Sequence, residues 1–487
     1  GNNPQLSRQT QGTASGVITG GKPVVVNTDG TVSEISEVTQ ALGTESVFES
    51  ASTGRQEMIF DSSNNRIVIS YQDAGNSNYG TAVVGSVSGT SISFGTPVVF
   101  ESANINAVAI HDMTFDNNLN KVVIVYGDGG NSNIPTAIVG TVDPSDNSIS
   151  FGTAVTLQGS GAINQGIAID FDSNSNKVLI VYGDGSNSNY FTGIVGTVSG
   201  TSISFGTKAV VNSAVNYYID VAFDSSNNKF AVVYTPDNSQ GRSKVATISG
   251  TDVTYGSEAN ITTAQSQHHR VNFDSSNNKI VVAYNDQDNS TTGTAIVGTI
   301  SGTDITFGTE AVIASGLAIQ SISYHTLVFD SNVNKMIHFA KDGADGDDAK
   351  VHIGTVSGTD ISFGSAIAVN GTDDVLHVSA AFDSNLNKIV LSYSDQGNSS
   401  HGTAVVFQNA IPTNLTSENF IGFAEDTVAD GQPVTINTKG AIDENQSSLT
   451  PAQQYFVQTD GTLGTSADDP SVVAGTAVTA TKLIVKG

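Results

Sequence analysis

FDSSNNKIVVAYNDQDNS, at residues 273–290, decides how this chain is interpreted. Its Asp and Asn residues would suit a metal site, because carboxylate and amide oxygens are ligands for hard cations. They would equally suit polar turns on either side of an apolar strand, KIVVAY (279–284). A search for self-similarity along the chain separates the two interpretations.

A repeat built on this stretch occurs seven times. The dipeptide Phe-Asp recurs at intervals of 55, 56, 52, 50, 56 and 53 residues, starting at Phe60, Phe115, Phe171, Phe223, Phe273, Phe329 and Phe382. Five positions after each Asp comes a basic residue preceded by Asn: Arg66, Lys121, Lys177, Lys229, Lys279, Lys335 and Lys388. Five positions further comes Tyr71, Tyr126, Tyr182, Tyr234, Tyr284 or Tyr393, with Ala340 in the remaining repeat.

Each repeat is predicted to form four strands. The first ends at Phe-Asp, the second is apolar on both faces, and the third and fourth are TAIVGTI (294–300) and DITFGTEAVI (304–313) in the repeat quoted above. Gly, Asn, Asp and Ser occupy the corners, where tight turns need them. Repeated four-stranded units of this length are typical of a β-propeller, so the sequence predicts a seven-bladed one.

The ends of the repeat array predict how the ring closes. The seventh repeat stops after its third strand, TAVVFQN (403–409), whereas QALGTESVFES (40–50) aligns with the fourth strand SFGTPVVFES (93–102). The N-terminal segment is therefore expected to supply the outer strand of the last blade. Such closure removes the open sheet edges of an unfinished array.

The segments outside the array are predicted to form a small β module. GKPVVVNTDGTV (21–32) aligns with GQPVTINTKGAI (431–442), and QPVTINT, QQYFVQT and TKLIVKG read as strands of the C-terminal segment. The predicted domains are residues 1–35 for the N-terminal strands of the module, 36–410 for the propeller and 411–487 for the C-terminal part of the module.

The recurring polar residues are interpreted first as structural. The Asp of Phe-Asp is expected to accept hydrogen bonds from backbone N–H groups two or three residues on. The basic residue is expected to reach an acidic neighbour. The recurring Tyr is expected to be a core residue with its hydroxyl in water.

The loop between the second and third strands leaves calcium binding open. An Asp is followed three residues later by Asn or Asp in six repeats, as at Asp286 and Asn289, and KDGADGDD (341–348) is the richest case. The spacing matches no complete EF-hand, so an Asx-type turn is favoured over a calcium site. No other cofactor is expected.

Composition excludes several functions. The net charge of −27, from 46 acidic and 19 basic residues, argues against nucleic-acid binding and against an anionic membrane surface. The eight His are scattered, and no HExxH, GxSxG, P-loop or dinucleotide fingerprint is present. We therefore expect no enzyme and single out no catalytic, cofactor-binding or metal-ligating residue.

The tail resembles a small β module of virion proteins of tailed, especially marine, bacteriophages. The resemblance rests on FIGFAEDTVADGQPVTINTKGAI (420–442), SSLTPAQQYFVQTDGTLGTS (447–466) and VVAGTAVTATKLIVKG (472–487). The resemblance extends to residues 15–35, and its motif is diffuse, resting on the Tyr-Phe-Val-x-x-Asp-Gly strand and turn and the closing Ala-Thr-Lys-Leu strand. In that family the module accompanies tail-fibre, appendage or capsid-decoration proteins, and no catalytic residue carries over.

The resemblance implies a non-enzymatic structural protein of a tailed phage, present in multiple copies or as a homo-oligomer. The small module would dock on other virion proteins, and the propeller would contact the host surface or a neighbouring subunit. GNNPQLSRQTQG (1–12) lacks the regions of a signal peptide, which favours assembly in the host cytoplasm and release in the particle. The alternatives are a secreted or surface glycan-binding propeller, calcium-dependent or not, and, less favoured, a propeller hydrolase.

Overall fold

The protein is described here by a computed structural model covering residues 8–105, 111–236, 239–317, 319, 321, 324–343, 346–371 and 374–486. Its elements are strands apart from a few short 3-10 turns, which confirms the all-β prediction. Within these residues no helix is long and apolar enough to cross a membrane. Contacts divide the chain into a small unit, Gly1–Ala41 with Asn409–Gly487, and a large unit, Leu42–Gln408.

In the large unit, the repeats form antiparallel sheets in which each strand pairs with the next along the chain. The first strands end at Phe-Asp: β5 (Ser46–Asp61), β10 (Asp112–Asp116), β15 (Ile163–Asp172), β20 (Asn216–Asp224), β24 (Ala259–Asp274), β29 (His325–Asp330) and β34 (Val375–Asp383). The second strands are β6 (Arg66–Asp73), β11 (Lys121–Asp128), β16 (Lys177–Asp184), β21 (Lys229–Pro236), β25 (Lys279–Asp286), β30 (Lys335–Asp342) and β35 (Lys388–Asp395). The third strands are β7 (Tyr79–Ser88), β12 (Ile134–Asp143), β17 (Tyr190–Ser199), β22 (Gln240–Ser249), β26 (Thr292–Ser301), β31 (Asp348–Ser357) and β36 (His401–Gln408).

The fourth strand, predicted as continuous, is interrupted after its first four residues. The first pieces are β8 (Ser91–Phe94), β13 (Ser148–Phe151), β18 (Ser202–Phe205), β23 (Asp252–Tyr255), β27 (Asp304–Phe307) and β32 (Asp360–Phe363). Separate second pieces are β9 (Val98–Asn104), β14 (Val155–Thr156), β19 (Ala209–Asn212), β28 (Ala311–Val312) and β33 (Ile367–Ala368). Both pieces pair with the third strand of the same repeat.

The Gly at this interruption lies against the neighbouring repeat. A Cβ built on Gly256 would lie 1.8 Å from the carbonyl oxygen of Thr303, which belongs to the Ser-Gly-Thr turn of the next repeat. The same approach recurs between Gly43 and Thr90, Gly95 and Asn147, Gly152 and Thr201, Gly206 and Thr251, and Gly308 and Thr359. Gly364, which precedes the repeat that lacks this turn, has open space around it.

The second strands are buried on both faces, as predicted from their apolar sequence. In β11, Val122, Val123, Ile124, Val125 and Tyr126 have no exposed surface. Apolar clusters join each sheet to its neighbours, for example by packing β11 residues with β16 residues. A sheet in this position gains its hydrophobic stabilisation from the repeats on either side of it.

The Phe-Asp turn forms as predicted. Asp274 accepts hydrogen bonds from the backbone N–H groups of Ser276 (2.9 Å) and Asn277 (3.0 Å). Equivalent bonds form at Asp61, Asp116, Asp172, Asp224, Asp330 and Asp383. The Asn before each basic residue adopts a left-handed conformation, with φ of +54° at Asn278. Asn tolerates that conformation better than other residues with a side chain, which explains why it recurs there.

The expected acidic partner of the recurring base is not what the base contacts. Lys279 Nζ donates to the Thr299 hydroxyl of the third strand at 2.9 Å, and Lys121 and Lys335 make the equivalent bond to Thr141 and Thr355. In these three repeats the base links the second strand to the third, whereas Arg66 donates to the Asn147 side chain and the Pro144 carbonyl of the next repeat.

The recurring Tyr is a core residue, as predicted, but its hydroxyl is not in water. Tyr71 is fully buried and donates to Glu49 of the preceding outer strand at 3.1 Å. Tyr126 donates in the same way to Glu101, and Tyr182 to Gln158, each at the outer strand of the preceding repeat. Tyr234 and Tyr393 donate instead to Glu258 and Glu45, at the outer strand of their own repeat. A buried hydroxyl needs a partner, and for Tyr71, Tyr126 and Tyr182 that partner joins one repeat to the next.

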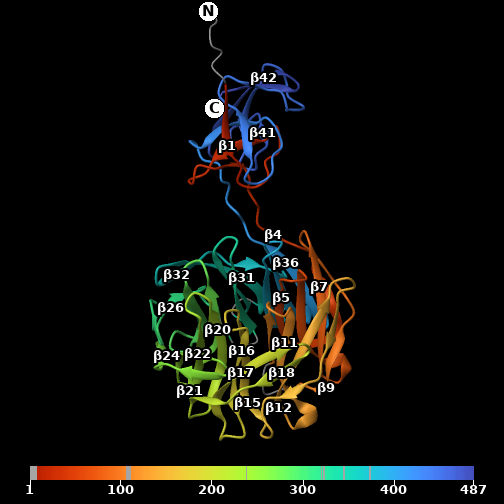
Figure 1. The fold of residues 1–487 in the computed structure, drawn as a ribbon, viewed down its shortest axis with the longest axis vertical. Coiled ribbons are helices and arrows are strands. Elements are labelled where there is room, and N and C mark those ends of the chain that lie inside the picture. The colour runs from red at the N-terminus through yellow and green to blue at the C-terminus, as the bar shows by residue number, and fades with distance from the viewer. Residues whose placement is uncertain are drawn as a thin grey trace, which may run out of the picture. The chain divides into compact units, whose positions relative to one another are not determined.

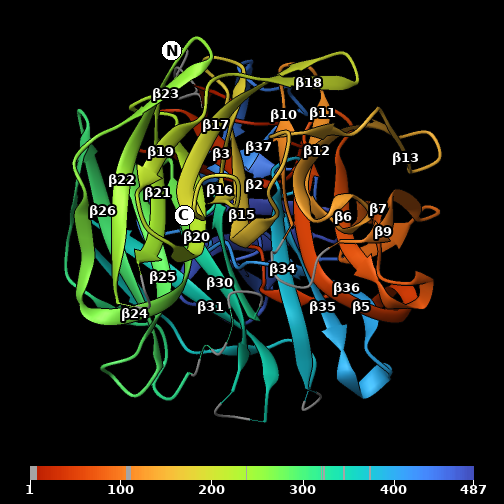
Figure 2. The same cartoon turned by 90° about the horizontal axis from the view of Figure 1, so that it is seen from below.

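Strand β5 links the two ends of the repeat array. Its first part pairs with β36, with His401 opposite Ser52 and Ala404 opposite Ser46, and its second part pairs with β6. This confirms that an N-terminal segment supplies the outer strand of the last repeat. The first strands contact one another in the order β5, β10, β15, β20, β24, β29, β34, and β34 contacts β5 again. Figure 2 shows the blue β35 and β36 beside β5.

The small unit joins both ends of the chain in one sheet. Its order is β1 (Gln9–Thr13), β38 (Pro433–Asn437), β37 (Phe420–Ala424), β2 (Pro23–Val26) and β3 (Val32–Glu34). A second sheet has the order β39 (Ile442–Asp443), β43 (Lys482–Val485), β42 (Val472–Thr479), β40 (Gln454–Val457) and β41 (Leu463–Gly464). Figure 1 shows the red N-terminal strands among the blue C-terminal ones. An apolar cluster that includes Val25, Phe423 and Leu483 joins the sheets.

The close approach between repeats gives a direct test of packing. We expect Gly256→Ala to lower the free energy of unfolding by about 1–3 kcal/mol, because the added methyl group overlaps the Thr303 carbonyl. Gly364→Ala is the matched control, and its effect is expected to stay within about 0.5 kcal/mol. Chemical denaturation of both variants measures the difference. Equal effects would contradict the packing described here.

Candidate functional site

In the acidic loops between second and third strands, the Asp carboxylates accept hydrogen bonds from backbone N–H groups of the same loop. The Asp286 carboxylate accepts from the N–H groups of Asp288 (3.0 Å) and Asn289 (3.2 Å). Asp73, Asp128 and Asp395 cap short 3-10 turns in the same manner. The Asx-type turn favoured by the sequence is therefore present at these positions.

The most acidic loop is engaged in ion pairs. In KDGADGDD (341–348), Lys341 contacts Asp347 at 3.2 Å and Asp374 at 2.9 Å. Asp342 contacts Lys350 at 3.0 Å. Residues 344 and 345 lie outside the described residues. Among the residues that are described, no group of three His, Asp or Glu side chains could hold a metal ion.

A set of carboxylates that the sequence analysis did not single out joins the first strands. One oxygen of Asp112 accepts from the next residue, Met113, at 2.7 Å, and the other accepts from Ile169 of the next repeat at 2.8 Å. Asp170 bridges in the same way to Phe223, and Asp220 to Val271. The sequence signal was an acid inside an apolar strand, one or three residues before the Phe of Phe-Asp.

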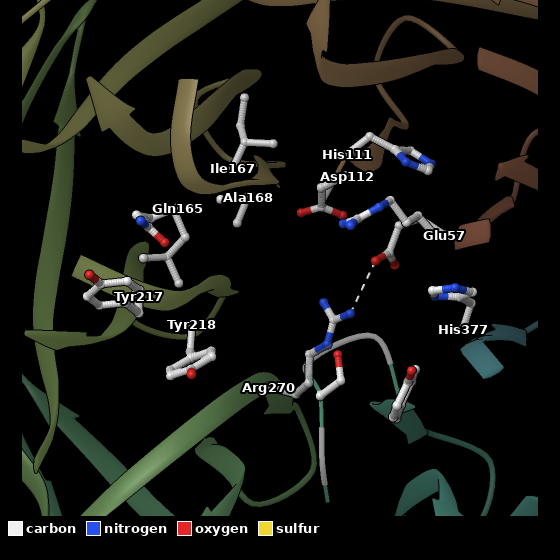
Figure 3. A pocket seen from close by; sticks show the side chains of 15 residues that line it. Glu57, His111, Asp112, Gln165, Ile167, Ala168, Tyr217, Tyr218, Arg270 and His377 are labelled. Atoms are coloured by element: carbon white, nitrogen blue, oxygen red, sulfur yellow. Dashed lines mark hydrogen bonds and ion pairs between the residues drawn. The ribbon is translucent and has the colours of Figure 1, made fainter. Parts of the chain in front are cut away.

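An ion pair connects two first strands that are not neighbours. Arg270 of β24 contacts Glu57 of β5 at 3.2 Å, and both side chains are only 11% exposed. Arg270 Nε also donates to the backbone carbonyl of His325 at 3.2 Å. Figure 3 shows the pair as the dashed line between Arg270 and Glu57. The pair spans the space that the first strands enclose.

The acids around this pair hold their protons more tightly than usual. Burial raises the pKa of Glu57, while Arg270 opposes the rise. Burial, followed by the nearby charges of Glu57 and Asp220, raises the pKa of Asp112 well above its usual range. Burial alone would lower the pKa of Arg270, but Glu57, Asp220 and Asp112 raise it above its usual value. Each acid thus takes up its proton more readily here than in water, and the arginine holds its own proton more tightly.

Two cavities lie against this cluster, and Glu57, Asp112 and Arg270 line both. The larger, of about 570 Å³, is lined on its far side by residues of the Phe-Asp turns such as Ser62 and Ser173. The smaller, of about 300 Å³, lies at the opposite ends of the first strands and is called the axial pocket below. Its lining includes Arg55, His111, Gln165, Tyr217, Tyr218, Tyr324 and His377.

Bulges in five first strands lie near the axial pocket, and four of their residues, Arg55, Gln165, Tyr218 and His377, line it. The strand register shifts between Gly54 and Glu57, and again next to Gln165, Tyr218, His268 and His377. At these bulges Arg55, Gln165, Tyr218, His268 and His377 have positive φ values of 49–70°. Such conformations cost about 1–3 kcal/mol each for residues with a side chain and collect at functional sites.

Aromatic and imidazole rings gather around the axial pocket. The Tyr218 ring meets the His268 ring edge to face at 4.3 Å, and the Tyr324 ring lies 6.0 Å from that of His377. The Nδ1 atoms of His111 and His377 are buried without a hydrogen-bond partner in the described part of the chain. Burial lowers the pKa of both rings to about 4, so both are neutral at pH 7.

The sequence repeat did not predict this pocket. Six residues before the Asp of Phe-Asp, no one residue type recurs in every repeat. The described residues there are Arg55, Gly166, Tyr218, His268, Tyr324 and His377, and all except His268 line the pocket. The recurring Tyr residues, which the repeat does single out, are buried between sheets.

Comparisons with known proteins identify no family for the chain. No family model matches it, and no curated protein matches it. One similar solved structure is a triple arginine-to-alanine mutant of AofleA from Arthrobotrys oligospora, with 10% identity over 70% of this chain and 94% of that chain and a TM-score of 0.43. Another is a protein of unknown function from Dyadobacter fermentans, with 11% identity over 77% and 99% and a TM-score of 0.41. Likeness at these scores supports no conclusion about this chain.

The ion pair can be tested by removing its cation. We expect Arg270→Met to lower the free energy of unfolding by about 3–5 kcal/mol at pH 7, because it leaves buried carboxylates uncompensated. The raised pKa values of Glu57 and Asp112 mean that the folded protein binds protons more readily than the unfolded chain. This contribution to stability is present at low pH and is lost as pH rises through the folded pKa, so the deficit should be smaller at pH 5 than at pH 8.

Arg242→Met provides the control for this measurement. Arg242 pairs with Glu258 at 3.5 Å in a more exposed setting, and its loss is expected to cost about 0–1 kcal/mol with little dependence on pH. Denaturation midpoints measured across pH would show the contrast. Equal losses in the two variants would contradict a special role for Arg270.

Proposed function

We propose that the large unit is a seven-bladed β-propeller. Three observations support this: the repeat recurs seven times in the sequence, the first strands contact one another in a cyclic order, and β5 pairs with both β6 and β36. Closing the ring in this way leaves no free sheet edge between the first and last repeats.

Electron cryomicroscopy of the purified chain tests the blade number. Class averages viewed along the ring axis are expected to show seven radial sheets around a narrow centre. Averages with six or eight sheets, or an open array, would contradict the proposal.

We further propose that the protein is a non-enzymatic structural component of a tailed phage virion, in a fibre, tail appendage or capsid decoration. The small unit would dock on other virion proteins, and the propeller would be exposed to the host surface or a neighbouring subunit. The proposal that the protein is not an enzyme is supported by the hydrogen bonds of the recurring polar residues. The Asp of the turn, the Lys between strands and the buried Tyr all form bonds that stabilise the fold.

The phage part of the proposal rests on the resemblance of residues 420–487. Its strand-and-turn motif forms in the small unit, where Tyr455 and Val457 are buried in β40 and Asp460 accepts the N–H of Thr462 in the following turn. These residues are thus used to build the module itself.

A glycan-binding surface protein is the second candidate. The axial pocket favours it, because an enclosed pocket with aromatic walls and a few convergent polar groups is the usual form of a small-molecule site. This candidate is compatible with the first, since attachment proteins also contact surface glycans.

Immunogold labelling of virions tests the particle assignment. Particles purified from a lysate in which the chain is produced are expected to carry label at a fixed position, and antibody pre-adsorbed with the purified chain is the control. Particles without label, with the chain free in the lysate, would overturn the assignment.

A further inference from the structure

We propose that the axial pocket binds one neutral sugar residue per chain, of the size of a single hexopyranose. The inference deepens the host-surface contact proposed above and rests on it for its biological setting. It follows from the size of the pocket, its aromatic walls, its balance of charge and its position on the repeat array.

The size of the pocket limits the ligand to one ring. Its volume of about 300 Å³ lies at the lower end of the roughly 300–1,000 Å³ found for small-molecule sites. The cluster of Glu57, Asp112 and Arg270 forms the boundary shared with the larger cavity. An oligosaccharide could therefore place only a terminal residue inside.

The walls match the two kinds of surface on a sugar. A pyranose has C–H groups on its faces and hydroxyls around its edge. Its faces therefore pack on aromatic rings, and its hydroxyls form hydrogen bonds with polar side chains. Tyr217, Tyr218 and Tyr324 supply partly exposed rings. Figure 3 shows Tyr218 and Gln165 across the pocket from His377 and Glu57. An aromatic ring with a polar tip suits both surfaces.

The polar groups favour hydroxyls over a charged ligand. The lining holds two cations, Arg55 and Arg270, and two acids, Glu57 and Asp112. Arg270 is paired with Glu57, and Asp112 accepts two backbone N–H groups, so a net charge on the ligand would disturb bonds that already exist. A hydroxyl both donates and accepts, and can pair with either sign.

The stoichiometry follows from the bulges. Arg55, Gln165, Tyr218 and His377 line the pocket from bulges of four first strands, and the four differ in residue type. A site repeated in every blade would require the same residue in each. The strained positions instead build a single asymmetric site where the repeats meet, so one ligand is expected per chain.

Saturation-transfer NMR tests the proposal with methyl glucopyranoside, galactopyranoside and mannopyranoside as neutral probes. Glucuronic acid and glucosamine serve as charged probes of similar size. We expect saturation transfer to at least one neutral probe, weaker transfer to the charged probes, and a ratio of one probe per chain in equilibrium dialysis.

Variants assign any binding to the axial pocket. Tyr217→Ala and Gln165→Ala are each expected to weaken binding at least tenfold. Tyr190→Ala, which removes a partly exposed tyrosine outside the pocket lining, should leave binding unchanged. Circular dichroism and thermal unfolding establish that each variant is folded before its binding is interpreted.

The outcomes separate this inference from the proposed function. Absence of transfer to every neutral probe, binding unaffected by both pocket variants, or preference for a charged probe would each overturn the inference. Labelled virions together with such a result would leave the particle assignment standing. Sugar binding in a chain absent from virions would overturn the assignment and support the pocket.

Discussion

The hydrogen bonds from buried carboxylates to the first strand of the next repeat are the constraint on which the large unit depends. No backbone ladder joins β10 to β15 or β15 to β20, because they belong to different sheets. Their facing N–H groups still need acceptors, since an unpaired buried N–H costs about as much as a lost hydrogen bond. Asp112, Asp170 and Asp220 supply those acceptors. The repeats are thereby fixed at the centre by side chains and further out by apolar packing.

This solution determines the chemistry of the centre. Carboxylates brought together out of water repel one another and are poorly solvated, which raises their pKa values. Burial raises that of Asp170 to about 6. A buried cation is then needed, and Arg270 supplies it opposite Glu57. The polar floor of the axial pocket is therefore a consequence of how neighbouring first strands are joined.

The sequence predicted those parts of the fold that depend on contacts within one repeat. The Asp274 turn and the buried strand β25 could be read from residue type and spacing. The pairing of an N-terminal segment with the last repeat followed from the alignment of residues 40–50 with a fourth strand. Side-chain contacts between repeats could not be read in this way. The Tyr71 hydroxyl was expected in water, but it donates to Glu49, because the outer strand of the preceding repeat packs close to it. The repeat length in the sequence does not show how closely two neighbouring sheets pack.

The axial pocket escaped prediction for the opposite reason. Repeat analysis selects residues that recur, whereas the pocket uses residues that vary at equivalent positions, such as Arg55, Tyr218 and His377. Bulges with positive φ are tolerated there because the rest of each repeat stabilises the fold without them. That rest comprises the Phe-Asp turn, the buried second strand and the Gly that packs against the next repeat. Recurring residues thus supply the stability that allows a few positions to adopt strained conformations. In a repeat protein of this kind, the places where the pattern fails are where a binding function is to be sought.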